Sequence, residues 1–87
     1  MKKDGNTVLV VDDDKAILRT FSRALQRADF SADTADNGKE ALERIQTRAY
    51  DVELIDVVLG GSNGLGLLLR IDELSPNTVK IIVTGAI

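Results

Sequence analysis

The sequence contains no cysteine. It therefore has no disulfide framework and no thiolate metal site, which is compatible with a reducing compartment. Aromatic residues make up only 3% of the chain, so a hydrophobic core must be built mainly from aliphatic side chains. No segment approaches the roughly 18 consecutive apolar residues of a membrane span, and residues 1–5 lack the apolar centre of a secretion signal. We therefore expect a cytoplasmic protein without a membrane segment.

Basic residues do not dominate the charge of the chain. Eleven Lys and Arg residues stand against 14 Asp and Glu residues, which gives a formal net charge of -3 at pH 7. Binding to a nucleic-acid backbone requires clustered basic side chains, so we expect no nucleic-acid partner. Arg19, Arg23 and Arg27 recur at four-residue spacing along one helical face, which we interpret as a solvated face.

Short apolar runs alternate with amphipathic stretches along the 87 residues, which is enough chain for one domain. We expect strands at residues 8–11, 29–35, 52–57 and 79–84, and helices at residues 15–28, from 37 onward, and 63–74. The order β-α-β-α-β-α-β is typical of an α/β fold with a parallel sheet flanked by helices. The segment 29–35 has little β-branched content, so we expect an edge strand there.

Helix ends are indicated by local sequence. In the first helix, we expect the apolar residues Ile17, Phe21, Ala24, Leu25 and Ala28 to line one face. At the start of the second, Asn37 can act as the cap, and Glu40 can reach back to the backbone N–H of that capping residue. The third helix should end before Pro76, because proline cannot continue a helix.

Polar side chains stand where three of the expected strands end. Asp12, Asp13 and Asp14 follow the first strand, Asp56 closes the third, and Thr84 closes the fourth. Ligands bind outside the carboxyl ends of parallel strands, so these groups should converge at one edge of the sheet. Three acids after a strand can also be only a turn and a helix cap, and we assign that structural role to Asp14.

Paired carboxylates such as Asp12 and Asp13, together with Asp56, form an oxygen-rich site suited to Mg²⁺. With their repulsion screened by the metal, the Asp56 carboxylate could attack a phosphorus atom and form an aspartyl phosphate. Thr84 could donate its hydroxyl to a phosphoryl oxygen. A metal that bridges phosphate and carboxylates supplies most of the charge stabilisation needed for such a transfer.

Four segments together resemble the response-regulator receiver domain of two-component signalling: residues 8–14, 37–42, 50–56 and 81–85. The resemblance covers essentially the whole chain, in the family's order and with closely similar spacing. It implies a flavodoxin-like sheet and a signalling module that is phosphorylated on itself and is not a turnover enzyme. The phosphodonor would be a sensor histidine kinase or a phosphotransfer protein.

The resemblance also implies roles for individual residues. Asp56 would be the phosphoacceptor and, with Asp12, Asp13 and the backbone carbonyl of Val58, a ligand of the Mg²⁺ cofactor. Thr84 would be the switch hydroxyl that moves toward the phosphoryl group. The small residue Gly85 would leave room for the phosphodonor.

The sequence departs from the family pattern in three places. Gly60 and Gly61 stand where a proline and a glycine are common, and Glu53 occupies a strand position that is usually apolar. The family's fifth strand, its lysine and the helices beside it have no counterpart in residues 1–87. We therefore expect a partial receiver domain with part of one sheet face uncovered, which a homo-oligomer would cover.

Two other functions remain open. A receiver fold could serve as an assembly module without phosphorylation, in which case Asp56→Asn would leave partner binding unchanged. A haloacid-dehalogenase-type aspartyl phosphatase also uses carboxylates after its first strand, but its Asp-x-Asp-x-Thr or Val motif does not match residues 12–16. Turnover of a phosphomonoester would favour the phosphatase, whereas a stoichiometric, Mg²⁺-dependent label on Asp56 would favour the receiver.

Overall fold

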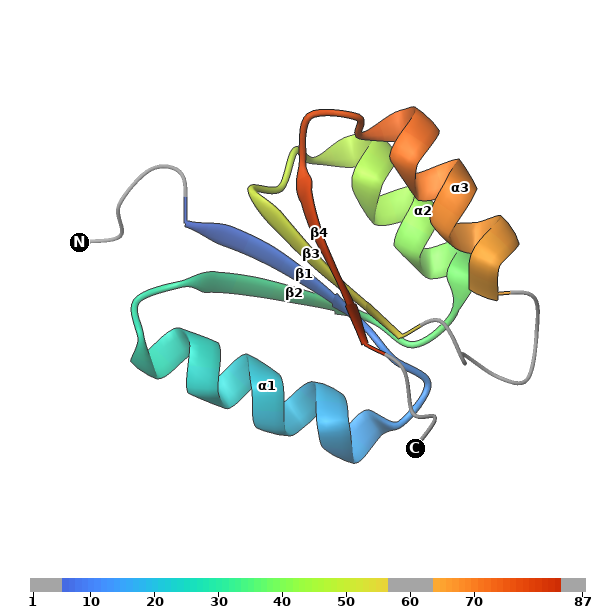
Figure 1. The fold of residues 1–87 in the computed structure, drawn as a ribbon. Coiled ribbons are helices and arrows are strands. Elements are labelled where there is room, and N and C mark those ends of the chain that lie inside the picture. Colours follow the sequence, from blue (N-terminus) through green and yellow to red (C-terminus); the bar gives the residue numbers. More distant parts are fainter. Residues whose placement is uncertain (1–5, 57–63, 84–87) are drawn as a thin grey trace.

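The computed structural model describes residues 6–56 and 64–83, which form one α/β unit (Figure 1). The elements in chain order are β1 (Thr7–Val11), α1 (Lys15–Arg27), β2 (Ser31–Ala35), α2 (Gly38–Thr47), β3 (Val52–Asp56), α3 (Gly64–Leu74) and β4 (Val79–Val83). The strands pair in parallel in the order β2-β1-β3-β4. The predicted strand-helix alternation is confirmed, and β2 lies at an edge of the described sheet as expected.

Helices cover both faces of the sheet. In Figure 1, α1 lies on one face, whereas α2 and α3 lie together on the other. The strand order explains this division, because the chain winds from β1 to β2 in one direction and then crosses back to β3 and β4. The point at which the direction reverses lies between β1 and β3.

Alternation along β1 supplies apolar side chains to both faces. The face under α2 and α3 holds the larger buried cluster, formed by Leu9, Val11, Ala35, Ala41, Ile45, Tyr50, Ile55 and Ile71. The face under α1 holds a smaller cluster, formed by Val8, Val10 and Leu18, with Leu25, Phe30, Val52 and Leu54 packed against it. As the low aromatic content predicts, both cores are mainly aliphatic.

The face that α1 turns toward the sheet differs from the prediction. Leu18 is the buried residue of α1, and Leu25 packs beside it. Ile17 and Phe21 are partly exposed instead. In the described residues, α1 packs over β1 and β2 and leaves β4 exposed, so the side chains on the β4 side of α1 are only partly covered.

Side-chain caps begin the first two helices. Asp14 Oδ1 accepts a hydrogen bond from the backbone N–H of Ala16 at 2.9 Å, and Asn37 Oδ1 accepts one from that of Glu40 at 2.8 Å. The prediction that the Glu40 side chain binds the backbone N–H of Asn37 was wrong by one residue. Its Oε1 accepts from the N–H of Asp36 at 2.9 Å, because the carboxylate reaches past the cap to the residue that precedes it.

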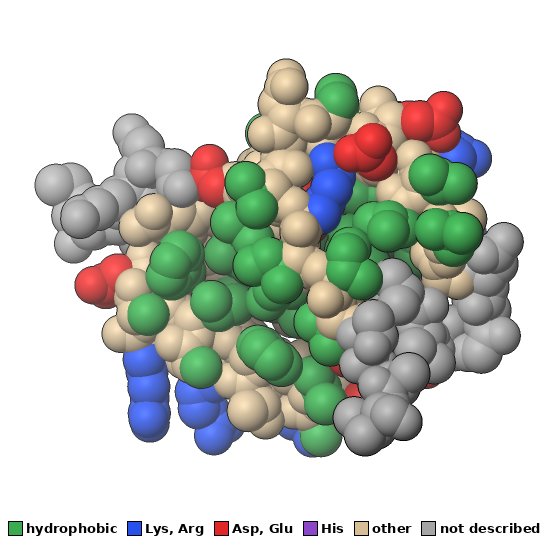
Figure 2. All heavy atoms as spheres, in the orientation of Figure 1, with side chains coloured by type: hydrophobic (Ala, Val, Ile, Leu, Met, Phe, Trp, Pro, Cys, Tyr) green, Lys and Arg blue, Asp and Glu red, His purple; other side chains and the backbone are tan. Residues whose placement is uncertain are grey.

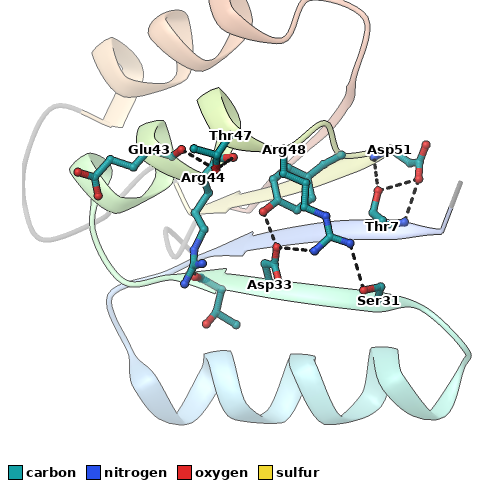
Figure 3. A network of polar contacts seen from close by, with 10 residues as sticks. Thr7, Ser31, Asp33, Glu43, Arg44, Thr47, Arg48 and Asp51 are labelled. Atoms are coloured by element: carbon teal, nitrogen blue, oxygen red, sulfur yellow. Dashed lines mark hydrogen bonds and ion pairs between the residues drawn. The ribbon is translucent and has the colours of Figure 1, made fainter.

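Polar contacts tie the strands together at the amino end of the sheet (Figure 3). Thr7 donates to Asp51 Oδ2 from its backbone N–H at 2.8 Å and from its hydroxyl at 2.9 Å. Both bonds lower the pKa of the Asp51 carboxyl, and the bond from the backbone N–H has the larger effect. Arg48 and Tyr50 both bind Asp33 Oδ2, at 3.0 and 2.6 Å. The contacts therefore link β1 to the start of β3 and β2 to the segment before it.

Apolar side chains remain exposed on β4. Val79 is 60% exposed and Ile81 is 48% exposed, and Val83 is similar. These three residues pair with Val52, Leu54 and Asp56 of β3, so they point toward the α1 side of the sheet. In the orientation of Figure 1, β4 is the strand nearest the viewer. Figure 2 shows that hydrophobic side chains gather on this face of the molecule. The predicted uncovered area is thus present among the described residues.

None of the helices in residues 6–56 and 64–83 is long and apolar enough to cross a membrane.

The Asn37 cap should contribute measurably to stability. We expect Asn37→Ala to lower the free energy of unfolding by about 1 kcal/mol, because the N–H of Glu40 loses its acceptor. Lys39→Ala, at an exposed position of the same helix, is the control and should change it by less than about 0.5 kcal/mol. Urea unfolding followed by circular dichroism measures both. Equal effects of the two substitutions would contradict the capping role.

Candidate functional site

The candidate site lies at the carboxyl ends of β1 and β3, where the strand order reverses. These two strands pair directly, with Val11 opposite Ile55. Asp12 immediately follows β1 and Asp56 is the last residue of β3. The parallel register therefore delivers both carboxylates to one edge of the sheet. Asp13 comes next in the chain, before the cap of α1.

Three acids meet at this edge. One carboxylate oxygen each from Asp12, Asp13 and Asp56 can be chosen so that all lie within 4.8 Å of one another. Asp12 is 9% exposed, Asp56 is half-buried and Asp13 is exposed. The structure thus brings together the three acids selected from the sequence. The other candidates, Val58, Thr84 and Gly85, lie outside the described residues, as do Gly60 and Gly61.

The environment of Asp12 disfavours its charge. Burial raises the pKa of the Asp12 carboxyl, and the negative charges of Asp56, Asp13 and Asp14 raise it further. One contact acts in the opposite direction, because the backbone N–H of Asp14 donates to Asp12 Oδ1 at 2.9 Å and lowers the pKa. The net direction is upward, so a positive charge nearby would favour the ionised form of Asp12.

Asp14 caps a helix and is not one of the three acids of the cluster. Its Oδ1 accepts hydrogen bonds from the backbone N–H groups of Ala16 at 2.9 Å and Ile17 at 3.4 Å, in the first turn of α1. The predicted assignment of Asp14 as a helix cap is confirmed. The cap also fixes where α1 begins, and thereby holds Asp12 and Asp13 in the short connection above β1.

The three carboxylates fit a hard divalent cation. Such ions take carboxylate oxygens as ligands, and Mg²⁺ keeps several waters when it has few protein ligands. A cation would also remove the repulsion that raises the Asp12 pKa. Asp12, Asp13 and Asp56 would hold it.

An apolar hollow adjoins the acids. A cavity of about 70 Å³ is bounded by Asp12 and Asp56 together with Ile17, Phe21 and Val83, among others. Sequence reasoning had placed Ile17 and Phe21 in the packed face of the first helix. Their positions one turn apart were visible in the sequence, but their place beside the acids depends on the open area over β4.

The family model of the response regulator receiver domain matches residues 8–87. The chain belongs to the response-regulator receiver family. This receiver is 40% identical over 78 residues to the DNA-binding transcriptional regulator NtrC of Escherichia coli, and 36% identical over 84 residues to the alginate biosynthesis regulator AlgB of Pseudomonas aeruginosa. The matches cover 90% and 97% of this chain but only 17% and 18% of those proteins. The receiver thus corresponds to a small part of each relative.

Solved structures agree with the flavodoxin-like fold of this receiver. A receiver domain protein from Methanospirillum hungatei superposes with a TM-score of 0.88 at 32% identity, over 94% of this chain and 66% of that one. The response regulator TrrA of Thermotoga maritima, solved with Mg²⁺ and BeF, gives 0.83 at 31% identity, over 99% and 71%. A Burkholderia pseudomallei response regulator, with a phosphorylated aspartic acid and calcium, gives 0.88 at 28% identity, over 94% and 48%.

Mg²⁺ should stabilise this receiver through the three acids. A ligand that binds only the folded state raises the free energy of unfolding by about 2.7 kcal/mol at about 100 times its Kd. We expect that response in the wild type, and a strongly weakened one in Asp12→Asn and Asp56→Asn. Thermal unfolding across a MgCl₂ titration measures it, with NaCl at equal ionic strength as the control. Equal stabilisation by NaCl, or a full response in both variants, would contradict a specific site.

Proposed function

We propose that this receiver accepts a phosphoryl group on Asp56 from a sensor histidine kinase or a phosphotransfer protein, with Mg²⁺ held by Asp12, Asp13 and Asp56. The observation that supports this most is the convergence of three carboxylates at the ends of two adjacent parallel strands. Structural acids need not meet in this way, whereas a phosphoryl-transfer site requires a cation and a nucleophile side by side.

The transfer proceeds by exchange of one bond for another. An Asp56 carboxylate oxygen forms a bond to phosphorus while the bond from phosphorus to the imidazole nitrogen of a phosphohistidine breaks. The leaving nitrogen keeps that electron pair and takes up a proton from solvent, which regenerates neutral histidine on the donor. Mg²⁺ held by Asp12, Asp13 and Asp56 would supply positive charge to the phosphoryl oxygens. Asp56 is half-buried, so part of the residue remains exposed among the described residues.

The resemblance assigns the remaining roles in this proposal. The Val58 carbonyl would be a further protein ligand of Mg²⁺, Thr84 would act as the switch hydroxyl, and Gly85 would admit the phosphodonor. Two solved relatives carry matching chemistry in their own sites, one a phosphorylated aspartic acid with calcium and the other Mg²⁺ with BeF. The phosphorylated chain is the product, so the domain acts as a signalling module in the cytoplasm and not as a turnover enzyme. The family match does not support the phosphatase alternative.

Asp56 should be the labelled residue when the receiver is treated with a small phosphodonor and Mg²⁺. Intact mass spectrometry should show the addition of one phosphoryl group per chain, and Asp56→Asn should abolish it. Asp29→Asn is the control, because Asp29 is an exposed aspartate outside the acid cluster and asparagine tolerates its positive φ of 68°. Labelling that persists in Asp56→Asn, or that does not require Mg²⁺, would contradict the proposal.

A second proposal, favoured by the exposed side chains of β4, is that another copy of the chain covers this area. Burying an apolar surface strengthens association, so Ile81→Lys should shift the molecule toward the monomer. Leu65→Lys on α3 is the control, since Leu65 is also exposed but lies outside the β4 area. Light scattering after size-exclusion chromatography, across a dilution series, measures the mass. A stable monomer at all concentrations would contradict this assembly.

A further inference from the structure

A second carboxylate of β3 lies at the opposite end of the strand from the phosphoacceptor. Glu53 has no exposed surface and points to the face under α2 and α3. Its neighbours across the strands are Leu9 of β1 and Lys80 of β4. An ionised carboxylate in such a position is costly unless a counter-ion or several hydrogen-bond donors compensate it.

The contact between Glu53 and Ser75 indicates where a proton lies. The Ser75 hydroxyl is 3.1 Å from Glu53 Oε1 and 2.8 Å from the carbonyl oxygen of Ile71. A hydroxyl has a single hydrogen, so it can donate to only one of these two oxygens at a time. While Ser75 donates to Ile71, its contact with Glu53 is a hydrogen bond only if the glutamic acid donates and the Ser75 oxygen accepts.

The other carboxyl oxygen is also informative. Oε2 of Glu53 is buried and has no hydrogen-bond partner. An ionised carboxylate would place about half of its negative charge on this unpartnered buried oxygen, which is strongly unfavourable. Burying the carbonyl oxygen of a neutral acid without a partner costs much less free energy. Protonation on Oε1 therefore accounts for both oxygens at once.

Lys80 is the nearest candidate for a counter-ion, but its ammonium is already occupied. Its Nζ donates to the carbonyl oxygen of Ser75, to that of Thr78 at 3.0 Å, and to Asp72 Oδ1 at 3.1 Å. An ammonium has three hydrogens, so these three acceptors saturate it. In this state, Lys80 holds the turn between α3 and β4.

The other charged groups around Glu53 are accounted for as well. Arg48 and Tyr50 line the same surface hollow as Glu53 and Ser75, a space of about 400 Å³, but both are bound to Asp33 (Figure 3). Burial raises the pKa of Glu53, and the charge of Asp72 adds to this, whereas Lys80 and the Ser75 contact lower it. The lowering by Ser75 applies while its hydroxyl donates to Glu53, and it is absent while that hydroxyl donates to the carbonyl oxygen of Ile71.

We propose that Glu53 is a proton-binding site that controls Lys80. With the proton in place, Glu53 donates to Ser75 and Lys80 stays on the turn that follows α3. When the proton leaves to solvent through the hollow, the carboxylate attracts the ammonium of its cross-strand neighbour. Neighbouring strands lie about 4.8 Å apart, so the lysine side chain can reach by changing rotamer, which releases Asp72 and the two carbonyls.

The sign of the pH effect follows from the direction of the shift. The folded chain binds the Glu53 proton more tightly than the unfolded chain, whose glutamate has a pKa near the ordinary 4.5. The contribution of Glu53 to stability is complete below that value and is lost as the pH rises through the raised pKa of the folded state. Each unit of difference between the two pKa values changes the folding equilibrium about tenfold.

NMR of side-chain carboxyl carbons tests this on the phosphate-free chain. We expect the Glu53 signal to titrate at higher pH than those of the exposed residues Glu43 and Glu73, and the Lys80 Nζ signal to change with the same midpoint. Glu53→Gln supplies a neutral N–H donor to Ser75 and should hold Lys80 on the turn at every pH. Lys80→Met keeps the apolar stem and should move the Glu53 midpoint still higher.

Two results would overturn the proposal. One is a Glu53 signal that titrates together with, or below, those of Glu43 and Glu73. The other is a Lys80 Nζ signal that ignores the Glu53 titration. Both measurements use the wild-type chain, so they decide the matter even where a variant fails to fold. Neither depends on Asp56, so a failure here leaves the phosphoryl-transfer proposal unaffected.

Discussion

The direct parallel pairing of β1 and β3 is the constraint on which the rest of this receiver depends. It places Val11 beside Ile55, so the next residue of each segment, Asp12 or Asp56, reaches the same edge. A shift of one residue would turn one of the acids to the other face. The register is held by the alternation of buried apolar residues and, at the far end, by the bonds between Thr7 and Asp51.

Much of this arrangement could be predicted from the sequence. The apolar runs and the acids at their ends gave the strands and the convergence of Asp12 with Asp56, because both depend on local periodicity and on general rules for parallel sheets. The buried face of α1 could not be predicted in the same way. Ile17 and Leu18 are equally apolar, and the choice between them depends on which strands lie beneath the helix. Thr84 and Val58 stay predictions, since they lie outside the described residues.

The carboxylates near the two ends of β3 both need their negative charge compensated, and the structure provides for this in two different ways. Asp56 lies in a partly open cluster, where three acids repel one another and a divalent cation can compensate them from solvent. Glu53 is fully buried beside a surface hollow, where a bound proton neutralises it and, after that proton leaves, the ammonium of Lys80 is the charge that can approach it. The sequence marked Glu53 as unusual for its strand, but its state depends on Ser75 and Lys80, which only the tertiary structure brings near.

β4 pairs with β3 along its whole length, so it lies beside both Glu53 and Asp56. Within the described sheet it pairs on one side only, with β3, and its α1-side residues remain exposed. Its backbone pairing with β3 is therefore the main described contact that holds β4 in place, and an edge segment of this kind opens more readily than the core of a fold. Lys80 fixes the start of β4 to the preceding turn, while Val83 pairs with Asp56 at its end. A charge change at Glu53 or at Asp56 thus occurs beside the same strand, near opposite ends of it.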